Sequence, residues 1–207
     1  EATKIPVARR IVGYGTADAL QHADVPTQVS STVMTLPPTT RIGYSVSRGD
    51  LLVELDDVDY KLQVIRAELA LTTAKSQQVL LAVERSAADE RAVLAKQDQT
   101  LSDAEFTRVN EAFERGAAKQ REVDLAMQKK IAAASSCINA TEQAERFPSM
   151  EEQQASTIST KQAELKLAQE NLRRCNILSP IDGAIQEIDV RVGEHVSSGK
   201  RVARVVN

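Results

Sequence analysis

Residues 60–175 open with YKLQVIRAELALTTAK (60–75), pass through NEAFERGAAKQREV (110–123) and close with KQAELKLAQENLRRC (161–175). The stretch is rich in Ala, Gln, Glu, Lys, Arg and Leu, and of the chain's 8 glycines and 6 prolines it holds only Gly116 and Pro148. Such a composition, with its helix breakers confined to the flanks, predicts helix. Because Gly116 lies near the midpoint, we predict two long helices that meet there.

Apolar residues recur at heptad spacing on both sides of this glycine. The rows are Leu80, Ala87, Leu94 and Leu101, with Leu62, Leu69 and Val83 on a second row, and after the glycine Ile131 and Ile138, then Ile158, Leu165 and Leu172. Two helices folded back on each other would bury such rows together. We therefore predict an antiparallel coiled-coil hairpin over 60–175 with its tip near Gly116, each arm on the order of 80 Å long at about 1.5 Å per residue.

Pro148 predicts a break in the second arm. The run Arg146-Phe147-Pro148 is typical of a helix stop, and Ser149 followed by Glu152 is typical of a capping box that starts a new helix. Across the hairpin, we expect residues 84–88 to face this break. A break here is either merely tolerated or shapes an assembled tube, and the sequence leaves both alternatives open.

The overall composition limits the classes of function. With 26 basic and 29 acidic residues the net charge is −3, so there is no basic surface of the kind that binds nucleic acid. No apolar run approaches the roughly 18 to 20 residues of a membrane span, and no signal peptide precedes Glu1. We expect either a cytosolic protein or an export signal or anchor that lies outside these residues. If the helix that carries Cys137 and Cys175 is continuous, the two residues lie about 57 Å apart, too far to form a disulfide.

The two flanks of the hairpin read as short strands and turns. Residues 1–28 are extended in character, and residues 11–17 fit a strand with a bulge. Residues 29–59 and 176–207 are short apolar pieces broken by Gly and Pro, which predicts short strands joined by tight turns.

These flanks contain an internal repeat. Residues 43–55 (GYSVSRGDLLVEL) align without gaps with residues 193–205 (GEHVSSGKRVARV), and both glycines, the valine and one serine are identical. Each copy has too little apolar surface to fold alone. We therefore predict that the two halves, 29–59 and 176–207, close into one β-sandwich across a pseudo-twofold axis. The hairpin over 60–175 is then inserted between the halves, which makes an α+β fold.

The G-x-x-V-x-x-G pattern in each half resembles the biotinyl/lipoyl domain. A lipoyl domain split by a helical hairpin resembles the membrane fusion proteins, the HlyD-like periplasmic adaptors of efflux pumps and type I secretion systems. Three stretches carry the resemblance, which spans about residues 29–207. They are GDLLVELD (49–56) at the start of the hairpin, RVNEAF through EVDLA (108–126) at its tip, and NLRRCNILSPIDG (171–183) at its end. Differences from the family are Ser31 and Ala112, where glycine and leucine are usual, Lys119, where serine is usual, and two extra residues near Pro37.

The resemblance implies a non-catalytic adaptor that links an inner-membrane RND or ABC transporter to a TolC-like outer-membrane channel. It also implies a homo-oligomer, a trimer or hexamer, in the periplasm, anchored to the inner membrane by a segment absent from this chain. A β-barrel domain is expected to flank the lipoyl unit, and residues 11–17 are a candidate barrel strand. The tip residues implied to bind the channel are Arg108, Ala112, Phe113, Arg115, Gly116, Lys119 and Asp124. Their side chains predict a cationic, partly apolar end suited to an acidic helical rim.

No catalytic, metal or cofactor site is expected. Lipoyl carriers bear their cofactor on a lysine, and Asp57 stands at the corresponding position. His22 and His195 are the only histidines, and neither has a Cys or a paired carboxylate at ligand spacing. Nucleophile-elbow, zinc-protease and phosphate-loop motifs are absent from the sequence. An alternative function is a cytosolic coiled-coil interaction scaffold on a β-base.

Overall fold

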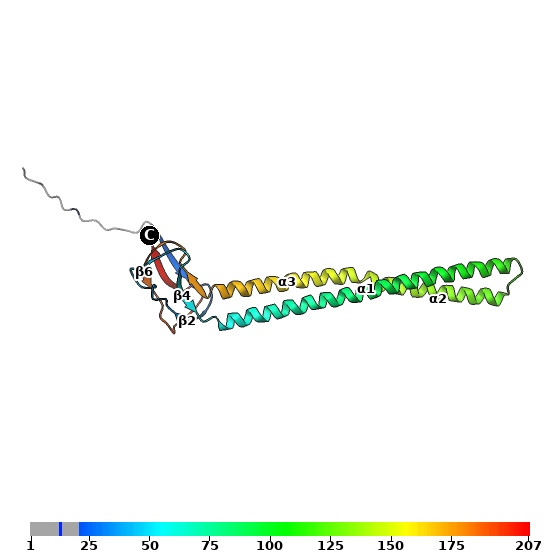
Figure 1. Cartoon of the computed structure of the whole chain (residues 1–207), viewed down its shortest axis with the longest axis horizontal. Helices are drawn as coiled ribbons and strands as arrows, with labels where there is room; N and C mark the ends of the chain where they lie inside the picture. The colour runs from blue at the N-terminus through cyan, green and yellow to red at the C-terminus, as the bar shows by residue number, and fades with distance from the viewer. Residues whose placement is uncertain (1–12, 14–20) are drawn as a thin grey trace, which may run out of the picture. The chain divides into compact units, whose positions relative to one another are not determined.

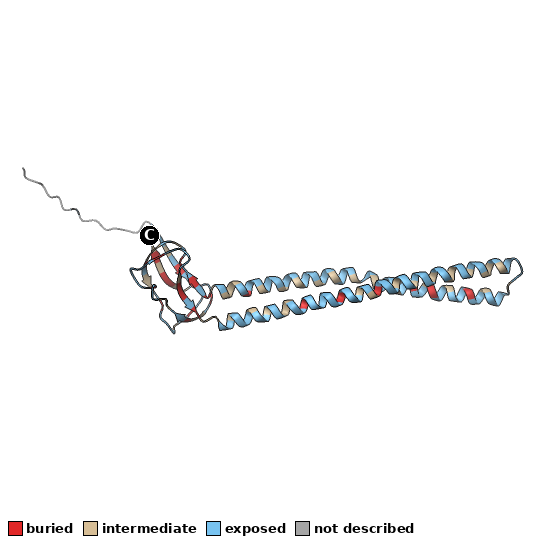
Figure 2. Ribbon diagram, viewed as in Figure 1, coloured by how far each residue is buried: buried red, intermediate tan, exposed pale blue. Residues whose placement is uncertain are grey.

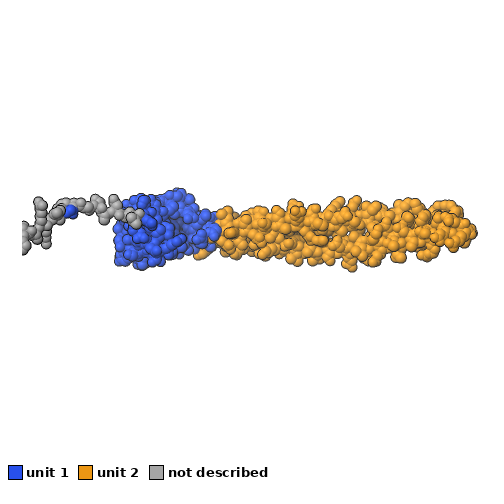
Figure 3. Space-filling model, turned by 90° about the horizontal axis from the view of Figure 1, so that it is seen from above, with its two compact units in different colours: residues 1–60, 170–207 blue, residues 61–169 orange. Residues whose placement is uncertain are grey.

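The computed structural model describes residue 13 and residues 21–207, so the strand predicted at 11–17 lies outside the described part except for Gly13. The elements along the chain are β1 (His22–Pro26), β2 (Ser31–Thr35), β3 (Ser45–Val46), β4 (Leu51–Leu55), α1 (Val58–Glu114), α2 (Gln120–Glu145), α3 (Phe147–Arg173), β5 (Asn176–Leu178), β6 (Gly183–Ile188), β7 (His195–Val196) and β8 (Arg201–Val206). They form two compact units: the chain up to Tyr60 with Glu170–Asn207, and Lys61–Gln169 (Figure 3). The predicted α+β fold, with a helical hairpin inserted between two β-halves, is confirmed.

The β unit consists of two four-stranded sheets, with strand orders β1-β8-β6-β3 and β5-β4-β2-β7. All strand pairs are antiparallel. The repeat relates β1 to β5, β2 to β6, β3 to β7 and β4 to β8. When each strand is replaced by its equivalent in the other half, the order of one sheet becomes the order of the other. Each sheet therefore contains two strands from each half. Only β2–β4 and β6–β8 pair within a half, so neither half can complete a sheet alone.

The repeated turns have the same backbone geometry in both halves. Gly43 and Gly49 have φ values of 87° and 94°, and the equivalent Gly193 and Gly199 have 84° and 89°. Residues that carry a side chain rarely adopt this left-handed backbone conformation, which explains why glycine recurs at these positions. The hydrogen bonds repeat as well: the N–H of Gly49 donates to the carbonyl of Ser179 at 2.8 Å, and that of Gly199 donates to Thr27 at 2.8 Å.

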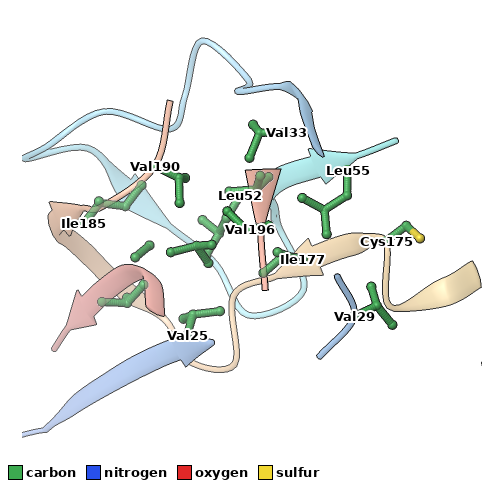
Figure 4. Close-up of a cluster of buried hydrophobic side chains, with 14 of the residues drawn as sticks. Val25, Val29, Val33, Leu52, Leu55, Cys175, Ile177, Ile185, Val190 and Val196 are labelled. Carbon is green, nitrogen blue, oxygen red and sulfur yellow. The ribbon is translucent and has the colours of Figure 1, made fainter. Parts of the chain in front are cut away.

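Aliphatic side chains from both sheets fill the space between them (Figure 4). Leu52, Val196, Val202 and Val205 are fully buried, and Cys175 and Val25 belong to the same cluster. Burial of each such side chain contributes on the order of 1.5 to 3 kcal/mol. Because β1 pairs with β8 and places Val25 in this core, the sandwich begins at residue 22 and not at residue 29 as predicted.

In the helical unit, α1 runs beside α2 and α3 (Figure 1). The predicted turn at Gly116 is confirmed, since α1 ends at Glu114 and α2 begins at Gln120. In the described chain no helix is both long enough and apolar enough to cross a membrane. Helix α1 begins at Val58 and α3 ends at Arg173, against predicted limits of 60 and 175.

The residues that pack between the arms are mostly small. Most residues of the hairpin are exposed or half-buried, as Figure 2 shows. The buried residues of the hairpin are Ala74, Leu81, Ala88, Ala126, Ala133, Cys137 and Ala168. They keep the heptad spacing, so the predicted coiled-coil period is correct. The prediction that the rows of large residues in α1 and α2 pack between the arms is wrong. Leu94 is 58% exposed, Leu101 is 70% exposed and Ile131 is 58% exposed. In α3, by contrast, Ile158, Leu165 and Leu172 are half-buried, as predicted.

The predicted break before Pro148 is confirmed. Helix α2 ends at Glu145, and α3 begins at Phe147. The predicted cap at Ser149 is wrong, because α3 has already begun two residues earlier. As expected, Glu84, Ala87 and Ala88 face the break, and with Phe147 they line a hollow of about 500 Å³.

Candidate partner-binding site at the hairpin tip

The turn at the tip closes α1 with two backbone hydrogen bonds. The N–H of Gly116 donates to the carbonyl of Phe113 at 2.8 Å, and the N–H of Ala117 donates to that of Ala112 at 2.8 Å. These two bonds define a Schellman motif, which needs a left-handed residue just past the helix end. Gly116 has a φ of 75° and satisfies this need. The sequence AFERGA therefore produces a tight helix end at this point.

Helix α2 begins with a reciprocal cap at Lys119. The backbone N–H of Lys119 donates to the Glu122 carboxylate at 2.9 Å, and the N–H of Glu122 donates to the Lys119 carbonyl at 2.9 Å. Position 119 is thus capped through its backbone and through the Glu122 carboxylate. A glutamate in the first turn also interacts favourably with the helix dipole.

The charges around the turn are balanced, so the predicted cationic end is wrong. Residues 108–124 contain four basic side chains and four acidic ones, namely Arg108, Arg115, Lys119 and Arg121 against Glu111, Glu114, Glu122 and Asp124. Arg115 lies 3.4 Å from Glu111, and both side chains are largely exposed. Exposed ion pairs of this kind contribute only about 0.2 to 1 kcal/mol. The tip therefore presents both signs of charge at its surface.

One side of the tip is hollowed between the two helices. The hollow has a volume of about 420 Å³ and is lined by Glu105, Arg108, Val109, Ala112, Ala118, Glu122, Leu125, Ala126 and Lys129. Small side chains at Ala112 and Ala118 leave this space open between the helices. Of the predicted site residues, the hollow brings together only Arg108 and Ala112.

The other predicted residues lie elsewhere around the tip. Phe113 is 40% exposed and offers an aromatic surface to solvent. Gly116 shapes the turn, and Lys119 begins α2. Asp124 accepts a hydrogen bond from Gln120 at 2.9 Å and does not line the hollow. Sequence reasoning missed Leu125, which is half exposed, because it belongs to neither of the heptad rows considered.

Ion pairs join the two helices just below the tip. Lys130 lies 3.2 Å from Asp103, and Lys129 lies 3.9 Å from Glu105. The Lys130 ammonium also lies 5.1 Å from the centre of the Phe106 ring, which is a cation–π distance. These contacts show which residues of the two arms lie level with each other in the antiparallel pairing.

The described residues include no cluster of three or more His, Cys, Asp or Glu side chains that could hold a metal ion. Asp57 lies in the two-residue link between β4 and α1. Its carboxylate cannot form the amide through which a carrier lysine holds lipoate or biotin.

Comparison with known proteins gives one family. Residues 21–207 match the profile of the RND MFP, barrel-sandwich hybrid domain. No curated protein matches the chain.

Several solved structures are similar in fold. The periplasmic adaptor protein EmrA is 16% identical, with 92% of this chain and 73% of that chain covered and a TM-score of 0.49. MacA from Actinobacillus actinomycetemcomitans is 20% identical, with 92% and 50% covered and a TM-score of 0.49. A putative efflux transporter from Bacteroides eggerthii DSM 20697 is 20% identical, with 92% and 40% covered and a TM-score of 0.47. The chain thus spans half or less of the last two proteins.

Proposed function

Because the chain belongs to the membrane fusion proteins of RND systems through its barrel-sandwich hybrid domain, we propose that it links an inner-membrane transporter to a TolC-like outer-membrane channel. The observation that carries the proposal is the match over residues 21–207. It covers both β-halves and the hairpin between them. The transporter is of the RND or the ABC type, and the cargo is a drug or a secreted substrate. No bond is made or broken in this role.

The hairpin tip is the surface proposed to dock on the channel. Its turn is held by the Schellman bonds of Gly116, and its exposed groups are a partly exposed Phe113 and side chains of both charges. One such contact is weak, since exposed pairs contribute about 0.2 to 1 kcal/mol. Several copies engaged at once would raise the overall affinity without any new contact.

The proposed setting is the periplasm, with an inner-membrane anchor outside these residues, and the proposed assembly is a homo-oligomer, a trimer or a hexamer. The rows of exposed aliphatic side chains on the hairpin support an assembly, because monomeric proteins rarely leave large apolar patches uncovered. The alternative, a cytosolic interaction scaffold, is disfavoured because a generic coiled coil needs no split sandwich at its base.

The test is a tip variant in the full-length protein expressed in its native envelope. Phe113→Ala combined with Arg115→Glu is expected to abolish export and copurification with the channel, while helicity stays as in the wild type. A matched control, Leu69→Ala with Arg66→Glu, changes the same two kinds of exposed residue far from the tip and should leave export unchanged. Normal export by the tip variant would show that the channel is docked elsewhere, and copurification with cytosolic proteins alone would favour the scaffold.

A further inference from the structure

The break between α2 and α3 leaves a hollow on the hairpin, far along the chain from the residues of the tip. It is lined by residues of α1, α2 and α3 and has a volume of about 500 Å³. Pockets that hold drug-sized molecules measure about 300 to 1,000 Å³, so this space is large enough for a small ligand. We call it the break hollow.

Apolar side chains form one part of the break hollow. Ala87 and Ala88 on α1 are small and leave the space open, and the ring of Phe147 at the start of α3 lies half-buried beside it. Val83 and Met150 complete this part and are 63% and 46% exposed. An aromatic ring and a flexible thioether adapt readily to the shape of an apolar ligand. This part of the hollow therefore suits the apolar body of a small molecule.

Two arginines line the same hollow from opposite arms. Arg91 lies on α1, and Arg146 is the residue at the break itself. Among the described residues neither of them forms an ion pair, whereas the nearby Arg85 pairs with Glu151. Glu84 is the acidic residue of the lining, so the lining carries a net charge of +1. The charged part of the hollow therefore favours a ligand with one negative charge.

We propose that the break hollow binds a small amphipathic anion, which has an aromatic or aliphatic body and one carboxylate or sulfonate head. The body lies against Phe147 and Met150, and the head accepts hydrogen bonds from Arg91 and Arg146, whose guanidinium groups match the geometry of such oxyanions. Anions of this kind are preferred over neutral or cationic molecules of the same shape, because the two arginines outnumber Glu84. The site goes beyond the adaptor function and does not depend on it.

The test uses two fluorescent probes that share one aromatic body. Anilinonaphthalene sulfonate is an anion, and phenylnaphthylamine is the same body without the sulfonate. Each probe is titrated into the purified full chain, and we expect the anion to bind with one site per chain and more tightly than the neutral probe. Arg91→Gln combined with Arg146→Gln should weaken binding of the anion about tenfold and change binding of the neutral probe by less than about twofold.

Two further variants locate the site. Arg41→Gln with Arg66→Gln is the matched control, because it removes the same charge from two exposed positions outside the hollow, and it should leave binding of both probes unchanged. Ala87→Phe fills the hollow with a ring and should weaken binding of both probes. Circular dichroism should show wild-type helicity for all three variants, since the changed residues are exposed or half-buried.

The proposal is overturned if the two probes bind equally well, if the variant of Arg91 and Arg146 binds the anion as the wild type does, or if Ala87→Phe binds both probes normally. Binding that falls as the chain is concentrated at a fixed ratio of probe to chain would also overturn it, because a second copy would then cover the hollow. The readout needs no channel or transporter. Failure of this proposal is thus distinguishable from failure of the adaptor function.

Discussion

Gly183 and Ser31 occupy equivalent places in the two β-halves. The structure has room for a side chain at position 31 but none at position 183. A Cβ added at Gly183 would lie 2.2 Å from the carbonyl oxygen of Val206 and 2.8 Å from its carbon. Val206 belongs to β8, which lies between β1 and β6 and pairs with both. Relief of the contact would therefore weaken two strand pairs at once. Ser31, in the other half, uses its hydroxyl to donate to the carbonyl of Asp56 at 2.7 Å.

We expect Gly183→Ala to destabilise the β unit. Overpacking of this kind costs about 1 to 3 kcal/mol, and the lower backbone entropy of alanine in the unfolded chain offsets about 0.5 to 1 kcal/mol. The net loss is then on the order of 1 to 2 kcal/mol. Urea unfolding followed by tyrosine fluorescence measures it, because Tyr60 packs against the core.

Ser31→Ala is the matched control for this prediction. It removes one hydrogen bond without a steric conflict and should cost about 1 kcal/mol or less. A Gly183→Ala chain that unfolds at the wild-type urea midpoint or above it would refute the reasoning, because the end of β8 would then move without loss of its pairs.

Three further predictions concern the turn, the break and the charges. Gly116→Ala should lower the thermal stability of the hairpin by about 1 to 2 kcal/mol, because the cost is backbone strain alone with nothing within 4 Å of the new Cβ; unchanged helix melting by circular dichroism would contradict this. Pro148→Ala should join α2 to α3 and raise the melting temperature, since the heptad phase of the buried residues continues across the break; a lower melting temperature would show that the break is needed. The hydrogen bond from Arg204 lowers the pKa of Asp24 below its usual 3.8. The stabilisation of the folded state by this pair is therefore present above pH 3.8 and is lost as the pH falls toward the lowered pKa. The stability difference between wild type and Arg204→Ala should therefore be constant near neutral pH and narrow in acid, and a difference that widens in acid would contradict the assignment.

Local features of this chain could be read from its sequence. Gly116 is the only glycine in a long helical stretch, and Pro148 is the only proline, so a turn at the first and a break at the second follow from backbone restrictions alone. The repeat at Gly43–Gly49 and Gly193–Gly199 likewise depends on φ values that glycine adopts readily. The exchange of strands between the halves follows the same symmetry but could not be assigned strand by strand.

Part of the candidate site could also be predicted from the sequence. The tip position follows from Gly116, and Arg108 and Ala112 do line a common hollow. The balance of charge was misread because the acidic residues around the turn were not weighed against the basic ones. Leu125 and Ala118 enter the hollow only through the pairing of α1 with α2, which sequence spacing within one helix does not report.

The sequence by itself determined the heptad period, the turn and the split β-domain, because these depend on spacing and on backbone freedom. Only the tertiary structure decided which heptad row is inside. A row at heptad spacing specifies a stripe but not the direction it faces. That direction depends on how the two helices pack against each other after the turn at Gly116. In this register, alanines such as Ala88 on α1 and Ala133 on α2 are each buried between the helices. The large residues predicted to pack between the arms, such as Leu94, Leu101 and Ile131, are exposed instead.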